Sequence, residues 1–480
     1  METLFKQAPN LIRYSITDDY YYMYNALYGN GRIVSKECND FFDSRQTVSK
    51  NEILNYFGEE MFNELLQLNY LYKIEEDERA LLEWELDQRQ QELHTGTYFD
   101  RVHLSTTNKC NMSCSYCFCS TFDYNDSGQQ TDTDMVRFPQ QAMSFEVAKE
   151  AIEKSIETIR QNGKNKLSVE FFGGEPFLNS KLIEEVLTYF GDGINRGVIL
   201  EYGVTTNGSY LPSSILGLLA EHKVRVAVSI DYIDYLTGEF RGEGNNLIKW
   251  STLDKNIGKL RDFNINIELQ SVMSEETWAH FNYELIDYAK KMGIKSIEII
   301  MSFDFEFYRK FGSIEIAERI LAAYDYAKAQ GVLLSGYWYQ SFWGIVHPDE
   351  WMERRAWKTC PTIGRLISIE PDGNAYACKT TSKKLGNTDS FQDIFSSEAY
   401  RYYGMRAYSN STGCINCELE GFCSGNCTGA VENEFDDIYN YDEAYCKTIK
   451  HIVRGLLERY FEEISVQLPE AENRTDYITT

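Results

Sequence analysis

Ten of the twelve cysteines fall into two groups, and the spacing of both suits iron–sulfur chemistry. The early group is Cys110, Cys114 and Cys117, in the string CNMSCSYC. A C-x3-C-x2-C loop can wrap three thiolates around one iron–sulfur cube, whereas a 4Fe–4S cluster usually takes four cysteine ligands. One iron is therefore left open. The alternative is a zinc site with a distant fourth ligand, although structural zinc sites generally combine two cysteine pairs.

This early group resembles the signature of the radical S-adenosylmethionine (SAM) enzymes, C-x3-C-x-aromatic-C, in which Tyr116 is the aromatic residue. The resemblance implies that the open iron chelates the amino and carboxylate groups of SAM. It also implies that an electron from the cluster cleaves SAM to a 5′-deoxyadenosyl radical, which removes a hydrogen from the substrate. In such enzymes the cofactors supply the chemistry, while the protein orients the reactants and excludes side reactions.

The seven cysteines of the late group follow the pattern C-x12-G-x4-C, then C-x2-C-x5-C-x3-C, then one more cysteine, with Gly373 as the glycine. This pattern resembles the SPASM domain, which binds two auxiliary iron–sulfur clusters. The resemblance implies that Cys360, Cys378 and Cys427 ligate auxiliary cluster I. It assigns four more to auxiliary cluster II: Cys414, Cys417, Cys423 and Cys446. Zinc ribbons are the alternative, but they tend to use two similar C-x2-C pairs.

The number of cysteines leaves two irons open. Three 4Fe–4S clusters have twelve irons, whereas the two groups supply ten cysteines. One open iron is the SAM site, and our hypothesis is that the other, on auxiliary cluster I, binds a substrate cysteine. Water, a non-cysteine side chain, Cys38 or Cys119 could fill that position instead. We expect Cys38 and Cys119 to be inert thiols, because isolated cysteines commonly pack as small hydrophobes; Cys119 is also a weak catalytic candidate.

The segment between the two groups alternates strand and helix patterns. Expected strands are LSVEFFGGEP, ILEYGVTTNG, VRVAVSID, INIELQSV and IEIIMSF, and helices are expected near 143–162, 180–190, 212–222, 247–261, 276–292 and 314–330. This α/β alternation predicts a parallel sheet, and the resemblance implies a partial six-stranded (β/α) barrel. Active groups should lie at the C-terminal ends of the strands. In the late group, RLISIEP and NAYACKT predict a hairpin around Asp372-Gly373.

Several polar residues lie at those predicted strand ends. Glycines allow a ligand to approach the backbone, and a glutamate can accept hydrogen bonds from an ammonium group. The resemblance implies that Gly173, Gly174, Glu175 and Pro176 hold the SAM amino group. It gives contacts with the ribose or methionyl part to Asn207, Ser229 and Asp231, the SAM carboxylate to Arg241, and a weaker role to Gln270. The structural alternative is that these residues form turns and caps.

The N-terminal region reads as a separate module. Residues 10–73 combine three short strands with helical patterns at 49–55 and 58–68, which suits a winged-helix-like fold. By position and pattern it resembles the recognition element of enzymes that modify ribosomal peptides, where a leader peptide adds as a strand to a sheet edge. A DNA-binding winged helix is the alternative, but the helical segment is mostly acidic and apolar. The expected domains are 1–73 for recognition, 74–98 as a helical linker, 99–335 for the barrel, and 336–480 for a bridging region and the SPASM domain.

Composition narrows the function classes further. The chain has 480 residues, 43% of them hydrophobic, with a formal net charge of -26, which indicates a globular protein and disfavours phosphate binding. It lacks a long apolar run, so we expect a cytoplasmic protein with neither membrane nor nucleic acid as partner. A flavodoxin- or ferredoxin-type reductant is the expected electron donor.

These observations predict a radical SAM/SPASM maturase of a ribosomal precursor peptide that joins a cysteine sulfur to a carbon as a thioether. Carbon–carbon crosslinking and sulfatase maturation to formylglycine are the alternatives within the family. An iron–sulfur regulator that binds DNA is the alternative from another class.

Overall fold

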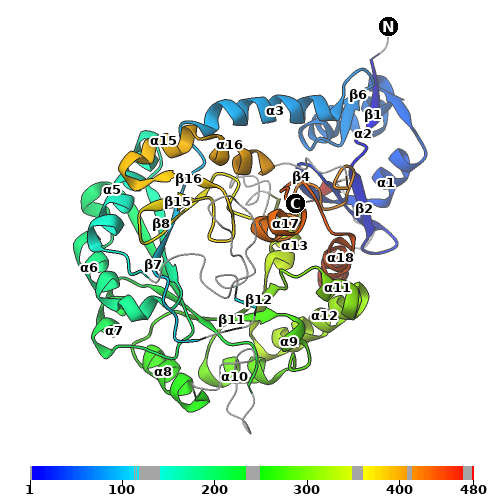
Figure 1. Cartoon of the computed structure of the whole chain (residues 1–480). Coiled ribbons are helices and arrows are strands. Elements are labelled where there is room, and N and C mark those ends of the chain that lie inside the picture. The colour runs from blue at the N-terminus through cyan, green and yellow to red at the C-terminus, as the bar shows by residue number, and fades with distance from the viewer. Residues whose placement is uncertain are drawn as a thin grey trace.

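The structure is a computed structural model that describes residues 3–112, 114, 116–117, 141–233, 249–348, 360–407, 413–466, 468 and 478–479. Figure 1 shows an arc of helices around a curved central sheet, with the N-terminal strands to one side. None of the described helices is both long and apolar enough to cross a membrane.

Seven strands of the central sheet run parallel to one another. They are β7 (Arg101–Thr107), β8 (Lys166–Gly173), β9 (Ile199–Thr206), β10 (Arg225–Ser229), β11 (Ile267–Met273), β12 (Ser296–Met301) and β13 (Leu333–Ser335). The helices between them include α5 (Phe145–Gln161), α6 (Ser180–Phe190), α7 (Leu216–Glu221), α8 (Trp250–Asp262), α10 (Glu284–Met292) and α12 (Ser313–Gln330). The predicted α/β alternation is therefore confirmed, and β7 and β13 extend the predicted set of strands.

Two predicted helices have different boundaries in the structure. The pattern over 276–292 forms α9 (Glu275–Trp278) and α10, because the Asn282 side chain accepts a hydrogen bond from Glu284 N–H and starts a new helix. The pattern over 212–222 forms a 3-10 turn, η3 (Ser213–Ile215), before α7.

Side chains of the parallel strands alternate between two environments. Along β8, Leu167, Val169 and Phe171 are fully buried in the main hydrophobic core beneath the helices. The alternate positions, including Ser168 and Glu170, point to the other face and are half-buried. Because strand side chains alternate with period two, the inner face of the curved sheet is free to carry polar groups.

The late cysteine region continues the same sheet. Strand β14 (Leu366–Ile369) pairs parallel with β7, and β15 (Asn374–Tyr376) and β16 (Lys384–Asn387) extend the sheet antiparallel. The predicted hairpin is thus β14–β15, and Gly373 in its turn has a φ of 83°. Beyond it come α15 (Phe391–Ser396), α16 (Glu398–Gly404), α17 (Thr428–Phe435) and α18 (Glu443–Ser465).

The N-terminal region contains two small antiparallel sheets. One has the order β5 (Thr47–Ser49), β1 (Leu4–Gln7), β6 (Leu71–Lys73), and the other β17 (Ile478–Thr479), β4 (Gly29–Ser35), β3 (Tyr20–Asn25), β2 (Leu11–Ser15). Helix α1 (Lys36–Asp43) and helix α2 (Lys50–Gln67), which is broken at Gly58, pack beside them. Helix α3 (Glu78–Leu93) follows.

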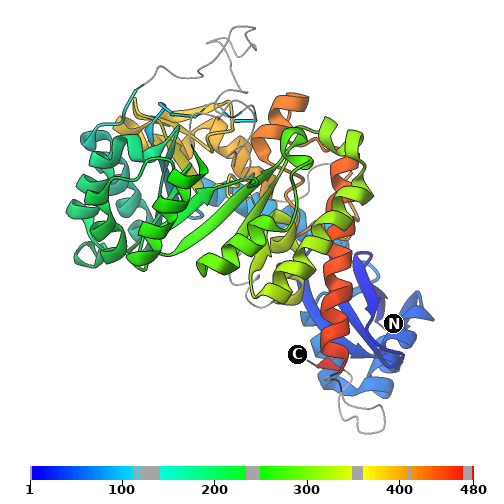
Figure 2. The ribbon, with the colours of Figure 1, turned by 90° about the horizontal axis from the view of Figure 1, so that it is seen from below.

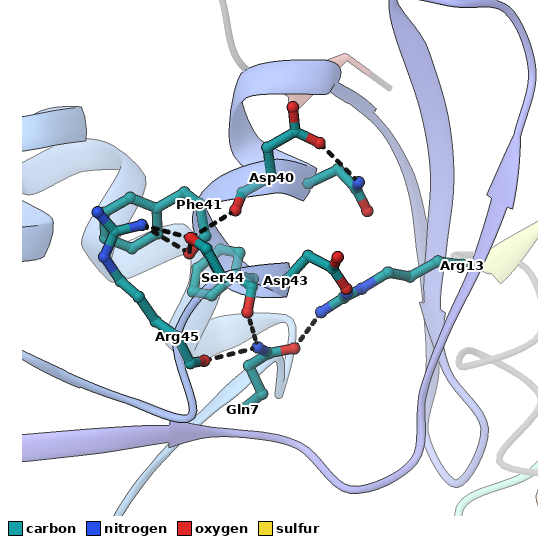
Figure 3. A network of polar contacts seen from close by, with 9 residues as sticks. Gln7, Arg13, Asp40, Phe41, Asp43, Ser44 and Arg45 are labelled. Carbon is teal, nitrogen blue, oxygen red and sulfur yellow. Dashed lines mark hydrogen bonds and ion pairs between the residues drawn. The ribbon is translucent and has the colours of Figure 1, made fainter.

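Polar contacts hold the strands of this region to α1. Figure 3 shows Gln7 of β1 near the end of α1. Its amide donates to the carbonyl oxygens of Phe42 and Arg45. Arg13 of β2 donates to the Gln7 side chain and to Asp43 Oδ1, the latter at 3.1 Å. The two sheets are therefore joined directly, by the contact of Arg13 with Gln7, and also through α1 and the residues that follow it.

Helix α18 links this region to the barrel. It packs against α12 and against α13 (Tyr337–Val346), and Figure 2 shows it running from the barrel to the N-terminal strands.

Candidate iron–sulfur and SAM site

The first cysteine loop lies against the glycines at the end of β8. Gly174 N–H donates to Thr107 O at 2.7 Å, and Glu175 N–H donates to Lys109 O at 2.8 Å. A Cβ on Gly173 would lie 2.3 Å from Thr107 O, and one on Gly174 would lie 2.2 Å from Lys109 O. Any side chain at these two positions would displace the backbone that leads into the cysteine loop, so the glycines are required for this close approach.

The Glu175 carboxylate joins the ends of β8 and β9. It is fully buried, and its Oε1 accepts from Thr206 Oγ1 at 2.7 Å and from Phe177 N–H at 3.1 Å. Its Oε2 accepts from Asn207 N–H at 2.8 Å. In the described structure this carboxylate holds the backbone of its neighbours. It thereby fixes where the Asn207 side chain lies, while Pro176 begins the short helix η1 (Pro176–Asn179).

Asn207 lies beside the first cysteine. Its Nδ2 donates to Asn111 Oδ1 at 2.9 Å and lies 3.8 Å from Cys110 Sγ, and its Oδ1 accepts from Ser209 N–H at 2.9 Å. An amide donor aimed at a thiolate sulfur stabilises the negative charge of an iron–sulfur ligand. The structure therefore brings Gly173, Gly174, Glu175 and Asn207 together around the first cysteine of the loop.

A second contact links the cysteine loop to the end of β10. The Tyr116 hydroxyl donates to Asp231 Oδ2, and Asp231 Oδ1 accepts from Val272 N–H at 2.8 Å. Ser229 and Gln270 are register partners on β10 and β11, and the Gln270 amide donates to Glu298 Oε2 at 2.8 Å. Gln270 is therefore engaged on the inner face of the sheet. Arg241 and Cys119 lie outside the described residues.

Three of the late cysteines, Cys360, Cys378 and Cys427, lie near one another. The Cys360 sulfur lies 3.1 Å from Thr362 Oγ1 and 3.3 Å from Thr428 Oγ1, and Arg406 donates to the latter hydroxyl at 2.7 Å. Burial raises the pKa of Cys378, with a further contribution from Cys360. Burial, with the thiols of Cys378 and Cys360, raises the pKa of Cys427 to about 12.

The other four late cysteines gather separately. Burial, with the thiols of Cys423, Cys414 and Cys417, raises the pKa of Cys446. Backbone N–H groups point at two of the sulfurs, from Leu419 to Cys417 at 3.5 Å and from Gly425 to Cys423 at 3.3 Å. The structure thus brings Cys360, Cys378 and Cys427 near one another and the other four late cysteines near one another, and the ligation of one cluster by each set stays a prediction.

These thiols fit iron–sulfur clusters in number, type and surroundings. Buried thiols with raised pKa values must lose protons to bind metal, which couples cluster binding to proton release. Hydroxyl and backbone donors around the sulfurs are the groups that stabilise ligated thiolates. Among the described residues no three His, Cys, Asp or Glu side chains converge as a site for one metal ion. Cluster ligands need not converge, since each thiolate of a cube binds a different iron.

One cysteine from each late set lines a shared small cavity. Cys360 of the first set and Cys423 of the second both line it, together with the rings of Tyr337 and Tyr445. Ser424, which directly follows Cys423, accepts a hydrogen bond from Cys360 N–H at 2.7 Å. The two sets are therefore neighbours, connected by one side chain.

The inner face of the barrel carries charged groups that sequence reasoning did not single out. Arg225 pairs with Glu170 at 3.0 Å and with Glu268 at 3.1 Å. Burial, with the nearby Glu268, raises the pKa of Glu298. Burial lowers the pKa of His103, which stacks on Phe172. In the sequence, these charged residues are indicated only by their alternate positions along the strands.

Lys379 also faces this interior. It directly follows Cys378, and its Nζ lies 3.6 Å from the centre of the Phe172 ring. A cation over an aromatic face is stabilised, more so when it is desolvated, and Lys379 is buried.

Comparisons with known proteins agree with this arrangement. The model of the radical SAM superfamily matches residues 104–306, and that of an iron–sulfur cluster-binding domain, SPASM, matches residues 360–428. The chain is 31% identical over 412 residues to the radical SAM cyclopropyl synthase TigE of Paramaledivibacter caminithermalis, covering 85% of this chain and 83% of that protein. It is 30% identical over 196 residues to an uncharacterized protein of Methanocaldococcus jannaschii, covering 40% of this chain and 59% of that protein.

Two solved structures share the fold. Streptococcus suis SuiB bound to its precursor peptide SuiA has a TM-score of 0.53 and 13% identity, covering 92% of this chain and 99% of that chain. The protein anSMEcpe with bound AdoMet and the Cp18Cys peptide has a TM-score of 0.59 and 17% identity, covering 77% of this chain and 99% of that chain.

Proposed function

Because this chain belongs to the radical SAM superfamily and carries a SPASM iron–sulfur domain, we propose that it is a maturase that forms a new bond within a ribosomal precursor peptide. The observation that carries this proposal is a direct contact between the N-terminal sheet that contains β3 and the segment between Cys417 and Cys423. Gly421 N–H donates to Ala26 O at 2.7 Å, and the Tyr24 hydroxyl donates to Glu418 O at 3.0 Å. A peptide held by the N-terminal region would thereby lie next to the segment between Cys417 and Cys423.

The SAM end of the site is proposed at the first cysteine loop. Cys110, Cys114 and Cys117 would hold a 4Fe–4S cluster, with the Gly173–Pro176 turn and Asn207 around it. With SAM bound, this cluster supplies a 5′-deoxyadenosyl radical that takes a hydrogen from the peptide. We propose that SAM is oriented by Ser229, Asp231, Gln270 and Arg241.

The auxiliary end is proposed at the two sets of late cysteines. Cys360, Cys378 and Cys427 would bind auxiliary cluster I, and the remaining four late cysteines would bind auxiliary cluster II. Bond formation removes two hydrogens from the peptide: one leaves as a hydrogen atom, and the other as a proton and an electron. The auxiliary clusters are suited to accept the electron. Glu298 is suited to hold the proton, because it is a half-buried carboxylate on the inner face with a raised pKa.

The N-terminal region is proposed as the recognition module. The proposal of a winged-helix-like module is supported by the order of helix α1, strand β5 and the two halves of α2, with β1 between β5 and β6 in the small sheet. The positive φ of 86° at Gly58 separates the two halves of α2. An extended leader peptide would add as a strand to an exposed sheet edge, where main-chain hydrogen bonds give affinity.

For the bond itself we propose ring closure between carbons, as a cyclopropane, because a relative that aligns along most of this chain is a cyclopropyl synthase. A thioether between a cysteine sulfur and a carbon is the second candidate. The number of cysteines supports this candidate, because Cys360, Cys378 and Cys427 supply three thiolates and a 4Fe–4S cube has four irons. A substrate thiolate would complete that set.

One experiment tests the function and separates the two products. Reduced, reconstituted holoenzyme is incubated anaerobically with SAM and the synthetic precursor peptide encoded beside this gene, and the products are treated with iodoacetamide. We expect 5′-deoxyadenosine and a peptide that has lost two hydrogens. With a cyclopropane, every peptide cysteine is still alkylated, whereas a thioether protects one. Absence of 5′-deoxyadenosine would contradict the proposed function and favour an iron–sulfur regulator.

A further inference from the structure

The edge of the N-terminal sheet already holds a peptide strand, and that strand comes from the chain's own C-terminal end. Strand β17 pairs antiparallel with β4, with Ile478 opposite Val34 and Thr479 opposite Ile33. The C-terminal end lies beside the N-terminal strands in both Figure 1 and Figure 2. The pairing joins residues more than four hundred positions apart in the sequence, and it uses the backbone of β4 on the side opposite β3.

The position of β4 makes this edge suitable for recognition. Val34 is fully buried in the core formed with α1 and α2. Ile33 instead packs against the main hydrophobic core, which belongs mostly to the barrel and the late cysteine region, here called the catalytic body. Because side chains alternate across a strand, a segment added beside β4 would present alternate residues to these two bodies. Main-chain hydrogen bonds would supply affinity, and the two different surroundings would supply selectivity.

The register also sets the direction of an added peptide. A strand antiparallel to β4 that continues past the position of Thr479 would run along Gly31 toward Gly29. At that end the catalytic body is adjacent: a Cβ on Gly31 would lie 2.9 Å from Ile345 O, and one on Gly29 would lie 3.4 Å from the Phe422 ring. Phe422 directly precedes Cys423. A leader bound in this direction would deliver the residues that follow it toward the cysteine-bearing body.

We propose that the edge of β4 is the acceptor for an extended segment of the precursor peptide, and that β17 occupies this edge when the substrate is absent. Substrate and tail then exclude each other at Ile33 and Val34. The proposal rests on the proposed function for the identity of its ligand. It adds to that function a location, a direction of binding and an intramolecular competitor.

The size of the competition follows from a population argument. A pairing of two residues is weak, but a tether keeps the segment at high effective concentration. If the tail occupies the edge for about half to nine-tenths of the time, the free edge is populated for about one-half to one-tenth. The apparent affinity for the peptide is reduced by that fraction, so removing the tail should tighten binding about two- to tenfold.

The test uses three variants of the full-length holoenzyme. The first deletes residues 468–480, beyond the end of α18. The second is I478P/T479P, which removes the backbone N–H donors of β17. The matched control is I478A/T479A, which retains those donors. Hydrogen exchange is measured over residues 29–35, and binding of the fluorescein-labelled synthetic precursor peptide is measured by anisotropy without SAM.

We expect faster exchange in β4 and about two- to tenfold tighter peptide binding for the deletion and the proline variant, with the alanine control like wild type. Added precursor should restore slow exchange in β4 of the deletion variant. Equal affinity of all variants, or no protection of β4 by bound peptide, would overturn this inference. The production of 5′-deoxyadenosine with a modified peptide is measured separately, so the proposed function can survive that result.

Discussion

Replacing Glu175 with glutamine tests whether this carboxylate mainly holds the ends of β8 and β9 together or mainly binds SAM. Its two oxygens accept three hydrogen bonds, from Phe177 N–H, Thr206 Oγ1 and Asn207 N–H. A glutamine that keeps its oxygen toward the first two donors places its own NH2 group against Asn207 N–H. At least one buried donor is then left without an acceptor.

The expected cost follows from these contacts. Losing a hydrogen bond to a charged group and leaving a buried donor unsatisfied costs about 2–4 kcal/mol. At roughly 2–4 °C per kcal/mol for a domain of this size class, the melting temperature should fall by about 4–16 °C. Glu157→Gln is the matched control, because Glu157 is exposed on α5, and it should leave the melting temperature unchanged. T206V should show a smaller loss of about 1 kcal/mol, and T206S should restore the hydroxyl.

The assay combines anaerobic differential scanning fluorimetry with equilibrium dialysis of SAM. We expect E175Q to lower the melting temperature and also to weaken SAM binding, because the Asn207 side chain and the cysteine loop lose their support. If E175Q bound SAM poorly but melted like wild type, the carboxylate would be a direct ligand of SAM, and its role in holding the strand ends together would be contradicted.

Three further predictions follow from the buried groups. Burial raises the pKa of Cys38 from 9.0 to about 12, so iodoacetamide at pH 8 should leave Cys38 unmodified until the protein unfolds; its neutral thiol favours the fold below pH 9, and this contribution is lost between pH 9 and 12. The raised pKa of Glu298 means that the folded state favours the protonated carboxyl, a contribution present below its unfolded pKa and lost as the pH rises through the folded value; E298Q should therefore melt above wild type at pH 8, with the difference vanishing near pH 4 in a pH series of melting curves. Ser424→Ala removes the hydrogen bond to Cys360 N–H, and it should change the EPR signal of auxiliary cluster I while leaving the iron content unchanged; an identical signal would show that this contact does not reach the cluster.

The local parts of the site could be predicted from the sequence. Cysteine spacing, the Gly173-Gly174 pair and the alternation of strands and helices are all local signals, and the strands that carry them lie where the pattern placed them. The strand over residues 101–107 was missed, although its first four residues alternate between half-buried and buried positions. Its polar histidine, serine and threonine side chains gave it a weak hydrophobic pattern.

The parts that could not be predicted depend on contacts between distant residues. The pairing of Arg225 with Glu170 and Glu268 joins strands β10, β8 and β11, with β9 lying between β8 and β10, and no single strand signals it. Thr428 beside Cys360 joins residues 68 positions apart. Strand β17 is only two residues long, so its pairing with β4 leaves no periodicity in the sequence. In such cases a residue's surroundings are set by the packing of elements that are distant in the sequence, and not by its neighbours in the chain.

The most direct test of the whole account is the iron content of the anaerobically purified and reconstituted protein, measured together with zinc and acid-labile sulfide. Three 4Fe–4S clusters predict about twelve irons per chain, and about eight when Cys110, Cys114 and Cys117 are all replaced by alanine. Close to four irons in the wild-type protein, or zinc in place of iron, would contradict it.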